Sequence, residues 1–139
     1  MSFQYLLDTN TLSESAKPIP NENVLTQLDI HQSEIATASI VIHELVYGCL
    51  RLPESRRRDA LWSYVQESVL SLPTFNYDCQ AAEWHAQERS RLTKIGKTPA
   101  FADGQIASIA FCNNLILVTN NVADFQLFED LRIENWFVS

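Results

Sequence analysis

Short hydrophobic runs alternate along the chain with longer segments in which apolar residues recur every three or four positions. The runs predict buried strands over residues 3–7, 34–38, 69–72, 115–118 and 133–138. The helical spacing predicts helices over residues 10–16, 22–31, 39–50, 54–68, 78–95 and 98–113. Strands separated by helices of this length favour right-handed crossovers and a mostly parallel sheet that is covered on both faces. The predicted fold class is therefore α/β, with a central sheet between two layers of helices.

Two of these helices carry sequence signals for where they begin. Thr98 followed by Pro99 has the residue types preferred at the N-cap and at the first helical position. Thr11, with Glu14 three residues later, has the pattern of a capping box for the first short helix. If Thr11 and Glu14 cap that helix, the neighbouring Asp8 remains free for another role.

Length and composition predict one domain over residues 1–139. A chain of 139 residues with 46% hydrophobic residues can form a single core, and no repeat or long linker divides it. No segment approaches the roughly 20 apolar residues that a membrane span needs, and no export signal is evident, so we expect a cytoplasmic protein without membrane attachment. Cys49, Cys79 and Cys112 are widely spaced and are expected to be buried thiols.

The formal net charge of −7 argues against a general nucleic-acid coat, because non-specific binding depends on Lys and Arg. It does not exclude a nuclease, since a bound cation reverses the local field. Basic residues gather at Arg89, Arg91, Lys94 and Lys97. This group is either a solvated helix face or a surface that guides a polyanion.

Four acidic residues stand where a hydrophobic element ends or turns inward. Asp8 follows the first predicted strand, and Asp124 lies just past the fourth. Glu44 and Asp103 fall on the apolar faces of two predicted helices. Each acid also has a purely structural explanation, as a helix cap, an exposed helix residue or part of a surface turn. Ligand sites in parallel sheets form beyond the carboxyl ends of the strands, so a shared acidic site is the interpretation we favour.

These four acids cannot form a cluster that is both fully ionised and empty: either the acids lie apart, some of them are protonated, or a metal ion lies among them. Two carboxylates about 4 Å apart repel by about 4 kcal/mol at an effective dielectric near 20. A fold that is stable by about 5–15 kcal/mol cannot hold four such charges together without compensation. Oxygen ligands favour Mg²⁺ or Mn²⁺ over zinc. His31, His43 and His85 show no ligand spacing and are expected to pack in the core or lie at the surface.

Four segments together resemble the PIN-domain family, and within it the VapC-type toxins of bacterial toxin–antitoxin pairs. The segments are Leu-Leu-Asp8-Thr9-Asn10, Glu44-Leu-Val-Tyr-Gly48, Phe-Ala-Asp103-Gly-Gln-Ile-Ala and Val-Thr119-Asn-Asn121-Val-Ala-Asp124-Phe125. Each segment alone is a weak signal, but their order and spacing cover essentially the whole chain. The resemblance implies a PIN-like three-layer α/β/α fold.

The resemblance further implies a Mg²⁺- or Mn²⁺-dependent endoribonuclease. On that basis Asp8, Glu44, Asp103 and Asp124 would bind the metal. Thr9, Asn10, Thr119 and Asn121 would support them through hydrogen bonds. A homodimer and a cognate VapB-type antitoxin are the implied partners. One departure is that many PIN domains have an acid where Asn121 stands, which would weaken any second metal.

The expected chemistry is in-line attack on RNA by metal-activated water. No Ser-His-Asp or Cys-His arrangement favours a covalent nucleophile. The basic group at Arg89, Arg91, Lys94 and Lys97 would guide the RNA. Two alternatives stay open at this point: a non-catalytic PIN-like binding module, and a haloacid-dehalogenase-type phosphatase. The phosphatase motif is only partly present, because Asn10 replaces its second aspartate.

Overall fold

A parallel sheet of five strands forms the centre of the protein in a computed structural model that describes residues 3–138. The strand order is β3-β2-β1-β4-β5, and every neighbouring pair is parallel. The strands are β1 (Tyr5–Leu7), β2 (Ile35–Ala38), β3 (Thr74–Phe75), β4 (Ile116–Val118) and β5 (Ile133–Glu134). The helices are α1 (Thr9–Glu14), α2 (Glu22–Ile30), α3 (Ser39–Leu50), α4 (Arg56–Glu67), α5 (Cys79–Lys94), α6 (Phe101–Cys112) and α7 (Val122–Phe125), with a 3-10 helix η1 (Val69–Ser71).

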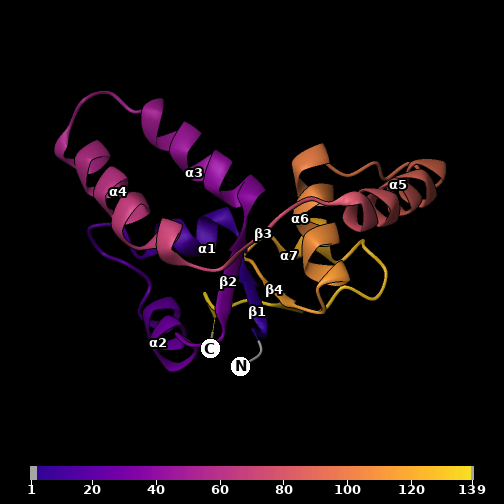
Figure 1. The fold of residues 1–139 in the computed structure, drawn as a ribbon, viewed down its shortest axis with the longest axis horizontal. Helices are drawn as coiled ribbons and strands as arrows, with labels where there is room; N and C mark the ends of the chain where they lie inside the picture. The colour runs from indigo at the N-terminus through magenta and orange to yellow at the C-terminus, as the bar shows by residue number, and fades with distance from the viewer. Residues whose placement is uncertain (1–2, 139) are drawn as a thin grey trace.

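Helices flank the sheet on both sides (Figure 1). The helices α1 to α4 lie on one side, and α5, α6 and α7 lie on the other. The core consists of side chains from the central strands, such as Leu6, Leu7 and Leu117, packed against the helices. The predicted α/β fold with three layers is confirmed. Because all strands run the same way, their carboxyl ends meet at one edge.

The third strand was predicted in the wrong place. Residues 69–72 do not form a strand, because Val69–Ser71 is a 3-10 helix and β3 begins only at Thr74. Val69 is buried, so the apolar character of this run reflects core packing at the end of α4. Pro73 lacks an N–H group, and its carbonyl accepts a bond of 2.9 Å from the Thr37 N–H of β2. The ladder between β2 and β3 therefore starts at the proline that directly follows the predicted strand.

Both predicted helix starts were wrong. Helix α6 has Ala100 at its N-cap without a side-chain cap, while the Thr98 hydroxyl bonds to the Thr93 hydroxyl at 2.9 Å. Helix α1 is capped by Asp8, whose carboxylate accepts a hydrogen bond from the Thr11 N–H. Glu14, the expected partner in a capping box, instead accepts from the Asn21 N–H and pairs with Lys17.

Smaller differences concern the C-terminal strand and the cysteines. Strand β5 ends at Glu134, because the chain then turns and the Asn135 side chain accepts the Phe137 N–H. Cys49 is buried as expected, whereas Cys112 is partly buried and Cys79 is exposed at the start of α5. Within residues 3–138, no helix has the length and apolar character that crossing a membrane would require.

Candidate active site at the carboxyl edge of the sheet

Asp8 lies at the carboxyl end of β1 and is only 5% exposed. Its Oδ1 accepts a hydrogen bond of 2.9 Å from the Thr11 N–H, and this bond caps α1. Burial raises the pKa of Asp8, and the negative charge of Glu44 adds to that increase. Hydrogen bonds from the Thr119 hydroxyl and the Thr11 N–H lower the pKa and offset part of the effect. The fold therefore holds this acid out of water, at the point where β1 and β4 end.

Glu44 approaches Asp8 from helix α3. It is half-buried, and its Oε1 accepts a hydrogen bond of 2.7 Å from the Thr9 hydroxyl at the start of α1. Thr9 is the residue after Asp8, so the same turn of chain carries one acid and fixes the orientation of another. This bond places Thr9 where a supporting residue is expected. Asn10, by contrast, is exposed.

Asp103 lies in the first turn of α6 and is half-buried. Burial is the largest cause that raises its pKa, followed by the charges of Asp124, Glu44 and Asp8. All three of the other candidate acids therefore act on this one carboxylate. The structure brings together four acids that are as much as 116 positions apart in the sequence, as the numbers of Asp8 and Asp124 show.

Asp124 completes the cluster from α7, just after β4. Its Oδ2 accepts a hydrogen bond of 2.9 Å from the Asn121 side-chain amide. The Asn121 N–H in turn donates to the hydroxyl of the buried Thr119 at 2.9 Å. The Thr119 side chain also lowers the pKa of Asp8, so Thr119 lies between the buried acid and the Asn121 that holds the exposed one. We refer to Asp8, Glu44, Asp103 and Asp124 as the acidic site.

The chemistry of the acidic site fits a divalent cation. Its donors are carboxylate oxygens, the ligands that Mg²⁺ and Mn²⁺ prefer, and the charges of Asp124, Glu44 and Asp8 add to the effect of burial in raising the pKa of Asp103. Among residues 3–138, no three Asp, Glu, His or Cys side chains are already arranged as a ligand set. Ionised carboxylates repel one another, which keeps these acids too far apart to form a ligand set. A bound cation would draw them closer together.

The four basic residues of the predicted RNA-guiding group do not share one location. Lys97 borders a cavity of about 280 Å³ together with Asp103 and Asp124, beside the acidic site. Arg89 and Lys94 line a second cavity of about 480 Å³. Arg91 turns elsewhere, because its guanidinium donates two bonds of 2.9 Å to the buried Glu88 and a third to the Leu127 carbonyl. Arg91 therefore holds α5 against the segment before β5.

Three aromatic residues lie near these cations, and none of them was predicted to belong to a site. Tyr77, His85 and Phe101 line the second cavity. His85 is 2% exposed, its Nδ1 lies 2.8 Å from the Tyr77 hydroxyl, and its ring packs against Phe101 with centroids 4.9 Å apart. The spacing of the buried positions on α5, which are Ala81, His85, Glu88 and Leu92, was the available signal.

The fold is a parallel α/β sheet, and the site is a group of acids at its carboxyl edge. Comparison with known proteins identifies the family. A model of the PIN domain matches residues 5–129. The chain belongs to the PIN-domain family, as its sequence motifs indicated. This membership removes the alternative of a haloacid-dehalogenase-type phosphatase.

Within that family, the similar proteins include a VapC endonuclease and a toxin. The chain is 32% identical over 133 residues to the tRNA(fMet)-specific endonuclease VapC of Salmonella typhimurium, covering 96% of this chain and 98% of that protein. It is 33% identical over 124 residues to toxin FitB of Neisseria gonorrhoeae, covering 86% and 89% of the two chains. The predicted resemblance to VapC-type toxins is confirmed.

Solved structures agree with both the fold and the family. FitAcB from Neisseria gonorrhoeae superposes with a TM-score of 0.88 at 31% identity, covering 98% of this chain and 100% of that one. DNA-bound VapBC from Salmonella typhimurium gives 0.84 at 30% identity, covering 96% and 98%. Ribonucleases of the PIN family generally depend on divalent metal.

Proposed function

We propose that this protein is a Mg²⁺- or Mn²⁺-dependent endoribonuclease and the toxin of a VapBC-type toxin–antitoxin pair, active in the cytoplasm. The observation that carries the proposal is the convergence of three other acids, Asp8, Glu44 and Asp124, on Asp103 in a chain of the PIN-domain family. Curated relatives are named as ribonucleases and as an endonuclease specific for tRNA(fMet). The hydrolysis of RNA is therefore the activity to expect.

Asp8, Glu44, Asp103 and Asp124 would hold the metal. When bound, a divalent cation acidifies a water molecule and offsets charge on the phosphate. The chain's own contribution is to fix the ligands before RNA arrives. Thr9 orients Glu44 through a bond of 2.7 Å, and Asn121 restrains Asp124 through a bond of 2.9 Å. Asn121 brings no charge, so a second metal would be held more weakly than the first.

Three cations would guide the RNA toward these acids. Lys97 shares a cavity with Asp103 and Asp124, and Arg89 and Lys94 extend the positive charge along α5. Arg91 would contribute through its hold on α5, since its guanidinium is occupied by Glu88. In a chain with net charge −7, this local positive charge gives a polyanion one favourable approach.

The proposed partner is a VapB-type antitoxin. The solved relatives include the complexes FitAcB and VapBC, the latter bound to DNA. An antitoxin of this kind would wrap the toxin and reach into the acidic site. A homodimer is also proposed, as for VapC-type toxins in general.

The test is to express the chain in a bacterial host without antitoxin and to sequence the RNA ends that accumulate. We expect new 5′ ends at discrete positions, with initiator tRNA as the first candidate substrate. Asp103→Asn should abolish them, because it removes a charged ligand. Asp29→Asn, which changes an exposed acid on α2, is the matched control and should cut like the wild type. A wild-type profile identical to that of Asp103→Asn would favour a non-catalytic binding module instead.

A further inference from the structure

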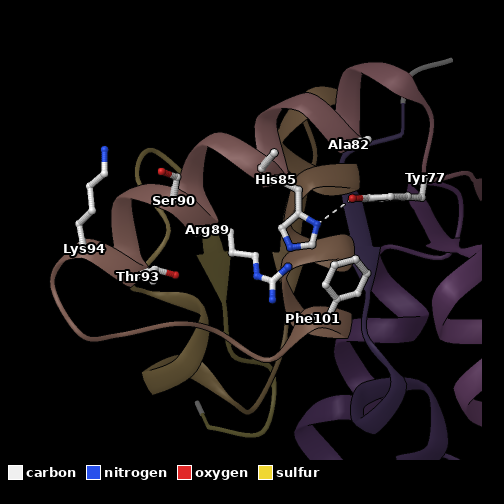
Figure 2. Close-up of a pocket in the computed structure, with 9 residues that line it drawn as sticks. Tyr77, Ala82, His85, Arg89, Ser90, Thr93, Lys94 and Phe101 are labelled. Carbon is white, nitrogen blue, oxygen red and sulfur yellow. Dashed lines mark hydrogen bonds between the residues drawn. The ribbon is translucent and has the colours of Figure 1, made fainter.

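A cavity of about 480 Å³ lies between α5 and the first turn of α6, outside the acidic site. Figure 2 shows its wall: Tyr77 and His85 at one end, the Phe101 ring at the start of α6, and Arg89 reaching from α5 toward that ring. Lys94 projects from the other end of the cavity. A volume of this size is in the range of small-molecule sites, about 300–1,000 Å³.

The cavity presents an aromatic ring at the surface beside a free cation. Phe101 is 51% exposed, although it is a large apolar residue. The Arg89 guanidinium carbon lies 5.3 Å from the centre of the Phe101 ring, within the range of a cation–π contact. An exposed ring with a stacked guanidinium offers flat surfaces to a planar, electron-rich ligand such as a nucleobase.

The rings beneath Phe101 keep it in place. The buried His85 packs against Phe101 and lies within hydrogen-bonding distance of the Tyr77 hydroxyl. Burial and the nearby charge of Arg89 both lower the pKa of His85, so its imidazole is neutral at physiological pH. The positive charge of the cavity therefore comes from Arg89 and Lys94, at positions where a phosphate can reach them.

The cavity is adjacent to the acidic site. Phe101 and Asp103 are two positions apart in the first turn of α6, so they lie on roughly opposite sides of a helix whose diameter is about 10–12 Å. The segment from Lys97 to Ala100 borders the cavity that contains Asp103 and Asp124. An RNA chain with one phosphate at the acids can therefore reach Phe101 by passing over the start of α6, within a few nucleotides.

We propose that this cavity is a subsite for one unpaired nucleotide of the RNA substrate, within a few nucleotides of the phosphate that is cut. The base stacks on Phe101 and the Arg89 guanidinium, and its flanking phosphates face Arg89 and Lys94. The proposal rests on the proposed ribonuclease function and adds to it that the substrate must be single-stranded at this position, because only an unpaired base exposes its face for stacking.

The test uses the full chain and a short single-stranded RNA that carries a fluorescent purine analogue, with EDTA present to prevent cleavage. Stacking quenches such an analogue. Wild type should quench it at one position of the RNA and should bind a duplex of the same sequence more weakly. Phe101→Leu keeps apolar bulk but removes the ring, and it should lose the quench and weaken binding by about 5- to 140-fold. Phe101→Trp should retain both.

Two matched controls separate the subsite from general effects. Phe111→Leu changes another exposed aromatic on the same helix, one that stacks on Trp84, and it should leave quench and affinity unchanged. Arg89→Gln should reduce the salt dependence of binding by about one phosphate contact. Arg57→Gln, an exposed cation on α4, should not change the salt dependence.

Wild-type affinity and quenching in Phe101→Leu would overturn the proposal. An equal loss of quenching and affinity in Phe111→Leu would also overturn it. A third contradicting result is a Phe101 variant that loses antitoxin binding while its RNA binding is intact, since the cavity would then be a protein contact. Failure of the proposed function would be a separate result. In that case the wild-type protein would not cleave RNA with Mg²⁺ present, regardless of how the Phe101 variants bind it.

Discussion

Asp8 caps a helix and is also proposed as a metal ligand, two roles with different chemical requirements. Its carboxylate caps α1 through the Thr11 N–H, and the same carboxylate is buried near Glu44. A cap needs only an oxygen acceptor, whereas a metal ligand needs charge. Sequence reasoning treated these roles as alternatives because Thr11 and Glu14 matched a capping box. In the structure Oδ1 accepts the capping bond, so the same carboxylate would have its second oxygen for the proposed metal.

The two roles can be separated by stability measurements in EDTA. Because the folded pKa of Asp8 is raised, its neutral form stabilises the fold, and that contribution is lost as pH rises from about 4 through the folded value. Asp8→Asn keeps the cap without the charge, so its advantage over wild type in free energy of unfolding should widen with rising pH. Asp8→Ala loses the cap and should be destabilised by about 0.5–2 kcal/mol relative to Asp8→Asn. Denaturant titrations at several pH values measure these differences. A difference between Asp8→Asn and wild type that narrows as pH rises would contradict the prediction.

The contact between α5 and α6 sets the position of Asp103. Gly104, the next residue, lies so close to the His85 ring that a Cβ there would overlap the ring, and the His85 Nε2 atom is buried with no hydrogen-bond partner in residues 3–138. Sequence reasoning placed Asp103 on the correct side of α6 from periodicity alone. It could not foresee this close approach, because contacts between helices depend on three-dimensional packing rather than spacing.

Gly104→Ala should therefore push α6 away from α5. We expect a loss of about 1–3 kcal/mol in free energy of unfolding from overpacking, together with slower RNA cleavage because Asp103 moves. Gly48→Ala is the control: nothing lies within 4 Å of the added Cβ in α3, so it should stabilise by about 0.5–1 kcal/mol. Adding His85→Ala to Gly104→Ala should restore part of the loss in a double-mutant cycle. Gly104→Ala with wild-type stability would contradict this reading of the contact.

At the scale of the whole molecule, parallel strand direction decides where the site forms. The apolar runs at residues 3–7 and 115–118 were strong enough to predict β1 and β4, and so the edge where Asp8 and Thr119 meet. The weaker run at 69–72 misled the prediction, since a buried apolar segment need not join a sheet. The dispersal of the four basic residues was equally hidden, because neighbours along a helix point in different directions and Glu88 competes for Arg91.

The most direct test of the account is RNA cleavage by purified protein with EDTA, and again after Mg²⁺ or Mn²⁺ is added back. Asp8→Asn, Glu44→Gln, Asp103→Asn and Asp124→Asn are compared with wild type and with the control Asp29→Asn. We predict no cleavage in EDTA, restored cleavage by wild type and Asp29→Asn with metal, and a loss of about 100-fold or more in each of the four site variants, in line with losing one preorganised charged group. Cleavage that persists in EDTA, or that survives in Asp8→Asn and Asp103→Asn, would contradict the account.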